Sequence, residues 1–128
     1  MIDFLTVEDV LQIHILQLER FGGAEGLRDL KLLESATAQA QASFDGDYLH
    51  PSLFDMASAY LYHLVLNHPF VDGNKRVALA SALIFLELNG VEITQGTQDL
   101  YDLTIEAAQS NTTKKQIAKE LKRLSNLS

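Results

Sequence analysis

The chain has 128 residues and a formal net charge of −7 at pH 7, with 47% hydrophobic and 21% charged residues. This balance is typical of a folded protein, and the length allows one core, so we predict a single domain over residues 1–128. The acidic balance argues against direct binding of nucleic acid or anionic membranes, because both require a basic surface, and the lack of cysteine excludes disulfides and thiolate metal sites.

The spacing of apolar residues predicts helices throughout the chain and therefore an all-α fold. The first helix is expected to begin after Thr6 and to end at residues 22–23, because glycine readily takes the left-handed conformation that ends helices. A second helix is expected after a cap at Asp29. Residues 44–51 have the composition of a turn-rich connection, and we predict that they act as a mobile flap.

Two nearly all-apolar helices are predicted in the middle of the chain. The first begins after a cap at Ser52 and runs to about Asn67, and the second runs from about Asn74 to Asn89. Because they are apolar on several faces, we expect them to form the buried centre of the domain.

The remaining chain is predicted to form two further helices, which gives six in all. Residues 91–93 are interpreted as a short extended piece, and a fifth helix is expected after a cap at Thr97. Thr113 and Gln116 form a capping box for the last helix. The basic residues near the C-terminus are interpreted as the solvated face of that helix, with a docking surface for an acidic partner as the alternative: Lys114, Lys115, Lys119, Lys122 and Arg123.

Nothing in the sequence predicts export or membrane insertion. The N-terminal residues lack the basic region and apolar run of a signal peptide. The most apolar stretch, residues 56–66, is too short to span a bilayer. We therefore expect a cytoplasmic protein.

The loop between the two central helices holds most of the chemically useful residues: His68-Pro-Phe-Val-Asp-Gly-Asn-Lys-Arg76. A helix that begins at Gly73-Asn74 presents unpaired backbone N–H groups and the positive end of its dipole, so it attracts an anion such as phosphate. Lys75 and Arg76 add two cations, which are poorly placed at a helix start for stability alone and therefore favour a function.

The same loop supplies an acid and a base. Asp72 is its one carboxylate, and beside phosphates we expect it to hold Mg²⁺. His68 ends the preceding helix and carries an imidazole suited to taking a proton at neutral pH. These parts predict a phosphoryl- or nucleotidyl-transfer site, although a histidine near a helix end is often structural and Asp-Gly-Asn is often only a turn.

Other residues near the motif are interpreted as structural. Phe70 is expected to anchor the loop in the core. The remaining histidines, His14, His50 and His63, are assigned to surface or core positions. The spacing of His63 and His68 shows no metal-binding signature.

The motif resembles the signature of the Fic superfamily, His-Pro-Phe-x-Asp/Glu-Gly-Asn-Gly/Lys-Arg, and Lys75 in its penultimate position resembles the Doc ("death on curing") branch. Four further segments also resemble that branch: residues 4–10, 20–23, 26–29 and 80–90. The resemblance implies a six-helix Fic/Doc-type fold and the toxin of a toxin–antitoxin pair. It also implies transfer of phosphate from ATP to a threonine of elongation factor Tu, which halts translation, with AMP transfer, as in most Fic proteins, as the alternative.

The resemblance implies a role for each motif residue. His68 would be the base for the target hydroxyl, and Asp72 would serve the metal ion. Asn74 and Arg76 would hold the phosphates, and the backbone amides around Gly73 would form the anion hole.

Two further features of the sequence concern the group that is transferred and the way in which the enzyme is inhibited. Lys75 stands where AMP-transferring members carry glycine, which favours the kinase interpretation. The chain lacks the Ser/Thr-x-x-x-Glu-Gly/Asn motif with which many Fic proteins inhibit themselves, so we expect a separate antitoxin. We predict that it binds as an amphipathic helix in a groove beside the motif and residues 44–51. The alternative is a non-catalytic module that only binds an antitoxin and acts as a co-repressor.

Overall fold

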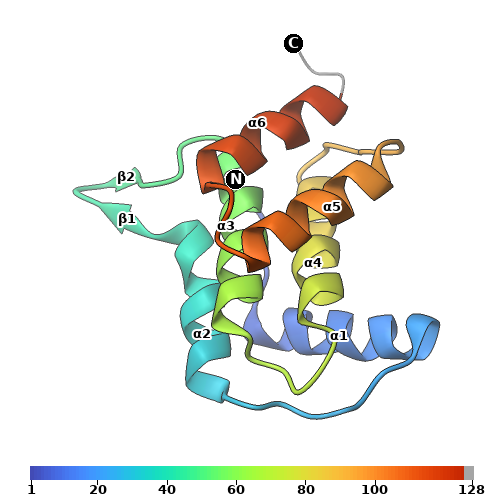
Figure 1. The fold of residues 1–128 in the computed structure, drawn as a ribbon. Coiled ribbons are helices and arrows are strands. Elements are labelled where there is room, and N and C mark those ends of the chain that lie inside the picture. Colours follow the sequence, from blue (N-terminus) through green and yellow to red (C-terminus); the bar gives the residue numbers. More distant parts are fainter. Residues whose placement is uncertain (126–128) are drawn as a thin grey trace.

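The computed structural model describes residues 1–125, which fold into six α-helices with one small hairpin (Figure 1). The last part of the predicted domain, residues 126–128, lies outside the described residues. The helices are α1 (Val7–Phe21), α2 (Leu30–Ala38), α3 (Leu53–Asn67), α4 (Asn74–Leu88), α5 (Thr97–Ala108) and α6 (Lys114–Leu124), and a short 3-10 turn, η1 (Gln39–Gln41), follows α2. The predicted six-helix fold is therefore confirmed, and none of these helices has the length and apolar character needed to cross a membrane.

Helices α3 and α4 form the centre of the domain, as predicted. They pack more extensively against each other than any other pair of elements and lie side by side in Figure 1, with α2 next to α3 and α1 across the foot of α4. Both helices bury large side chains completely, among them Tyr60 on α3 and Phe85 on α4. The loop that joins the two helices is therefore anchored at both ends in the packed core.

The helix starts follow local sequence signals in most cases. Capping boxes at Thr6, Ser52 and Thr113 are all formed, as predicted. Helix α5 is different, because its N-cap is Gly96 in the left-handed conformation and the predicted cap, Thr97, is already the first helical residue. A Cβ atom at Gly96 would lie 2.6 Å from a side-chain carbon of Leu124, so close packing against α6 places glycine at this point.

The predicted turn-rich connection after α2 contains a hairpin. Strands β1 (Ser43–Phe44) and β2 (Asp47–Tyr48) pair antiparallel and project from the helical body (Figure 1). The two residues between them, Asp45 and Gly46, both have positive φ angles, of 54° and 86°. That is the pattern of a type I′ turn, for which Asp-Gly is a preferred sequence. The prediction of an irregular connection overlooked this signal, and the mobility of the segment stays a prediction.

Residues 91–93 belong to no helix or strand among the described residues, so the short extended piece expected there stays a prediction. One prediction about the C-terminal part is wrong. Lys114 does not belong to a solvated face, because its Nζ atom lies 3.2 Å from Nε2 of His50 and 3.0 Å from Nε2 of His63. The prediction of exposure holds for the four other basic residues of the group, which are Lys115, Lys119, Lys122 and Arg123.

Candidate active site

His68 occupies the first position beyond α3 and has an unusual backbone conformation. Its φ and ψ angles are 51° and 53°, in the left-handed region, and its side chain is exposed. A non-glycine residue in this region costs about 1–3 kcal/mol, so the surrounding contacts must hold it there. The next two residues, Pro69 and Phe70, are buried, which turns the chain back into the core. Phe70 is 1% exposed, which confirms its predicted role as an apolar anchor.

Asn74 closes the loop between α3 and α4. Its side-chain Oδ1 accepts a hydrogen bond from the Phe70 backbone N–H at 3.0 Å, and its Nδ2 donates one to the Phe70 carbonyl at 3.0 Å. The Asn74 side chain is buried, so this pair of bonds determines the shape of the loop. A direct contact between this side chain and phosphate stays a prediction. The backbone N–H of Asn74 lies in the first turn of α4, where it has no partner within the helix.

His14, which the sequence did not connect with the motif, supports the loop from α1. Its ring stacks on the ring of Phe70 with 3.8 Å between centroids and 11° between planes. Its Nε2 lies 2.8 Å from the backbone carbonyl of Asp72, which identifies Nε2 as the protonated nitrogen that donates the hydrogen bond. His14 is 4% exposed. Of the two positions left open for it, surface or core, His14 takes the core position, and its contacts hold the motif loop.

The carboxylate of Asp72 accepts two backbone hydrogen bonds. The N–H of Ala24 donates to Oδ2 and the N–H of Gly73 donates to Oδ1, each at 2.9 Å. These two bonds are the main reason that the pKa of Asp72 lies below its usual value, so the carboxylate is ionised at neutral pH. A Cβ atom at Gly23 would lie 2.8 Å from Asp72 Oδ2, so the turn after α1 fits closely around this carboxylate.

The residues around Asp72 fit Mg²⁺ only when the phosphates of a substrate provide further ligands. Among residues 1–125, no group of three or more histidine, cysteine, aspartate or glutamate side chains gathers as a ready-made metal site. Mg²⁺ is commonly bound by one or two carboxylates, water and substrate phosphates. Asp72 provides one ionised carboxylate beside the start of α4, which agrees with that mode of binding.

The start of α4 has the geometry predicted for an anion site. Its N-cap, Gly73, has a φ angle of 80° and provides no side-chain hydrogen bond to the first turn. The N–H groups of that turn are therefore available to a ligand. Lys75 is exposed and Arg76 is half-buried, so both predicted cations lie in this same first turn.

Comparison with known proteins agrees with this site. The model of the Fic/DOC family matches residues 4–86, which include the whole motif. The chain belongs to the Fic/Doc family. It is 44% identical over 93 residues to "Toxin Doc" of Mycolicibacterium smegmatis, an alignment that covers 73% of this chain and 69% of that protein. It is 33% identical over 120 residues to "Protein kinase doc" of Escherichia phage P1, which covers 94% of each chain.

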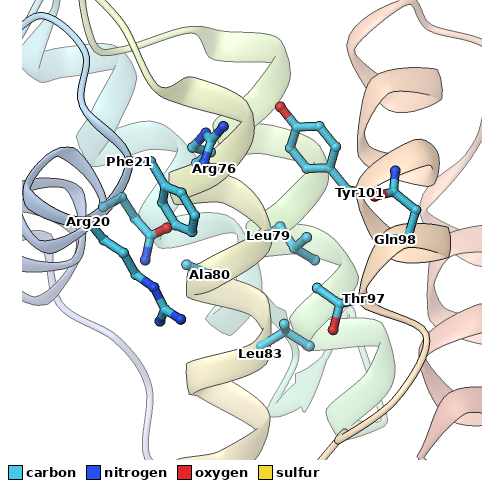
Figure 2. A pocket seen from close by; sticks show the side chains of 10 residues that line it. Arg20, Phe21, Arg76, Leu79, Ala80, Leu83, Thr97, Gln98 and Tyr101 are labelled. Carbon is cyan, nitrogen blue, oxygen red and sulfur yellow. The ribbon is translucent and has the colours of Figure 1, made fainter.

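In this Fic/Doc protein a groove of about 690 Å³ lies beside the motif, between α1, α4 and α5 (Figure 2). Arg76 connects the motif to the groove, because its guanidinium carbon lies 4.1 Å from the centre of the Phe21 ring. The groove is lined by Gln17, Arg20, Phe21, Arg76, Leu79, Ala80, Leu83, Thr97, Gln98 and Tyr101. Residues 44–51 do not line this groove, and antitoxin binding at that segment stays a prediction.

Proposed function

We propose that this Fic/Doc protein is the toxin of a toxin–antitoxin pair and transfers the γ-phosphate of ATP to a hydroxyl group of a target protein. The observation that carries the proposal is the order of groups along the motif loop: an exposed imidazole, an ionised carboxylate and an uncapped helix start with two cations. The names of the relatives, a toxin and a protein kinase, support the same activity. A threonine of elongation factor Tu is the proposed target, on the resemblance of the motif to the Doc branch.

In the proposed reaction, His68 removes the proton of the target hydroxyl. The hydroxyl oxygen forms a bond to the γ-phosphorus, while the bond from that phosphorus to the bridging oxygen breaks and ADP leaves with the electron pair. The backbone N–H groups in the first turn of α4, beginning with that of Asn74, and the charges of Lys75 and Arg76 stabilise the negative charge on the phosphate oxygens. The N–H of Gly73 instead holds the carboxylate of Asp72. Mg²⁺ held by Asp72 and the nucleotide would neutralise part of that charge.

The transferred group is tested with ATP labelled separately at the α- and γ-phosphates. We expect only the γ-label on elongation factor Tu, whereas α-label on the protein would show AMP transfer and overturn the kinase proposal. His68→Ala is expected to lower the rate by about 10²–10⁴-fold, because the base is lost while the phosphate site remains. A decrease in rate of less than about tenfold would indicate that His68 has a structural role instead.

The alternative of a non-catalytic binding module makes a different prediction. Expression of the wild type in bacteria should arrest growth, and expression of Arg76→Ala should not, because the phosphates lose a bidentate partner. Equal arrest by both proteins would favour binding without chemistry. Mass spectrometry of the proteins of the arrested cells would identify the target.

The proposed antitoxin site is the groove between α1, α4 and α5. Leu79, Ala80 and Leu83 provide an apolar surface, and Arg20 and Arg76 provide positive charge at the same groove. This combination suits an amphipathic helix with acidic residues beside its apolar face. Hydrogen exchange with and without antitoxin is the test: we expect added protection along α4 and the motif loop, and no added protection there would exclude this site.

A further inference from the structure

Arg28 reaches the backbone of His68 from the segment between α1 and α2. Its Nε donates a hydrogen bond to the His68 carbonyl at 2.7 Å, and its Nη2 donates one to the Asn67 carbonyl at 2.9 Å. The backbone N–H of Arg28 also donates to the carbonyl of Pro69 at 2.7 Å. One residue therefore binds three successive carbonyls around the proposed base, and in Figure 1 its segment runs next to the loop that joins α3 to α4.

Two features of this part of the chain favour a guanidinium group beside it. The last carbonyls of a helix have no partners within it, and a cation at this end interacts favourably with the helix dipole. His68 also needs outside contacts to keep its left-handed conformation. Arginine presents two donors in a rigid fork, whereas the lysine ammonium is a point charge on a flexible stem. Arg28 is thus suited to hold two adjacent carbonyls in one orientation.

The rest of the loop is held independently of the Arg28 side chain. Leu27 and Phe70 form an isolated antiparallel bridge, and the N–H of Val71 donates to the carbonyl of Gly26 at 3.0 Å. These contacts use backbone atoms, and Phe70 is also anchored by Asn74. Loss of the guanidinium should therefore release the backbone at His68 without unfolding the loop.

We infer that Arg28 is a positioning residue for phosphotransfer: its guanidinium fixes the backbone of His68 so that the imidazole faces the target hydroxyl. The inference rests on the proposed function, in which His68 is the base. It assigns Arg28 no role in binding ATP, because the two donors of its guanidinium fork, Nε and Nη2, are bound to the carbonyls of His68 and Asn67. Its removal should therefore affect the chemical step and spare nucleotide binding.

The test compares Arg28→Met, Arg28→Lys and the control Lys31→Met, an exposed cation at the start of α2. For phosphotransfer to elongation factor Tu we expect kcat to fall about 10- to 100-fold in both Arg28 variants, with KM for ATP within about twofold of the wild type. Lysine should not restore kcat, because it lacks the forked donors. The control should keep both constants. In NMR spectra of the full chain, the His68 resonances should shift in the Arg28 variants, and those of His50, which lies beside Lys114, should not.

Three results would overturn the inference. The first is an Arg28→Met enzyme with kcat within twofold of the wild type while His68→Ala is inactive, which leaves the proposed function intact. The second is a loss of kcat in the Arg28 variants that is fully explained by the fraction of unfolded protein, as measured in a thermal melt. The third is unchanged His68 resonances. If His68→Ala itself keeps full activity, the proposed function fails first, and the NMR comparison still reports whether Arg28 holds the backbone.

Discussion

At the scale of single residues, the site depends on backbone groups as much as on reactive side chains. Both oxygens of Asp72 are bound by backbone N–H groups, and His14 binds the carbonyl of the same residue. Asn74, which looks like a phosphate ligand in the motif, uses its side chain to close the loop on Phe70. The motif therefore contains residues that maintain its shape next to residues that are proposed to react.

The close fit of the turn around Asp72 leads to a prediction at Gly23. Alanine at Gly23 places its Cβ 2.8 Å from Asp72 Oδ2, whereas alanine at Gly22 meets nothing within 4 Å, and both positions have positive φ angles. Both variants should lose stability through backbone strain, by about 1–3 kcal/mol. Only Gly23→Ala should also displace the carboxylate and raise the Mg²⁺ concentration needed for half-maximal phosphotransfer. Equal Mg²⁺ requirements in the two variants would show that Asp72 is not the metal ligand or is not displaced.

At the scale of elements, a polar cluster of Lys114, His50 and His63 connects α6 to α3 and to the segment before α3. The Lys114 ammonium lies within hydrogen-bonding distance of Nε2 on both His50 and His63, so both imidazoles must be neutral to accept. Burial, followed by the charge of Lys114, lowers the pKa of His50. The charge of Asp55 and the backbone of Gln39 act on the pKa of His50 in the opposite direction to Lys114.

This cluster predicts a loss of stability in mild acid. Burial, then the charge of Lys114 and repulsion from His50 when both imidazoles are protonated, lowers the pKa of His63 from 6.5 to about 4 in the folded protein. Between these two values the unfolded chain binds a proton that the folded chain does not bind, so stability is complete above pH 6.5 and falls as the pH is lowered toward 4. The midpoint of urea unfolding should therefore decrease over this range in the wild type.

Replacement of His63 isolates this effect from the titration of carboxylates. His63→Gln keeps a hydrogen-bond acceptor for Lys114 but cannot be protonated, so its urea midpoint should change less between pH 6.5 and 4.5. His68→Gln, at an exposed histidine outside the cluster, should keep the pH dependence of the wild type. If the urea midpoint changes with pH in the same way in all three proteins, the assignment of this effect to His63 is wrong.

At the scale of the whole molecule, the N-terminal residues are tied to both central helices. The N–H of Leu5 donates to the Tyr60 hydroxyl on α3 at 2.9 Å. Asn89, at the end of α4, accepts a hydrogen bond from the N–H of Asp3 and donates one to its carbonyl, at 2.8 and 2.9 Å. These bonds fix the segment that leads into α1, and α1 in turn supports the motif through His14.

We predict that Tyr60→Phe weakens this connection measurably. Phenylalanine leaves the buried N–H of Leu5 without its acceptor, which should lower the free energy of unfolding by about 1–3 kcal/mol. Tyr101→Phe is the control, because Tyr101 is only partly buried at the groove and the change should cost less than about 0.5 kcal/mol. Urea unfolding followed by circular dichroism measures both. Equal stability of Tyr60→Phe and wild type would show that the Leu5 bond contributes nothing.

Features that depend on neighbours within a few residues could be predicted from the sequence. The caps at Thr6, Ser52 and Thr113 each bond to a residue three positions along, so their signals lie in one short stretch. The apolar character of α3 and α4 likewise predicted their burial. The composition of residues 68–76 was enough to propose a phosphate site and to place the chain in its family.

The contacts between side chains that are far apart in the sequence could not be predicted and became visible in the fold. His14 and Asp72 are 58 positions apart, Arg28 and His68 are 40 apart, and Lys114 and His63 are 51 apart. Helical periodicity assigns a residue to a face but does not specify which residue of another helix or loop it contacts. That choice depends on how helices cross and how far each is shifted along its axis, which is settled by the packing of the whole core.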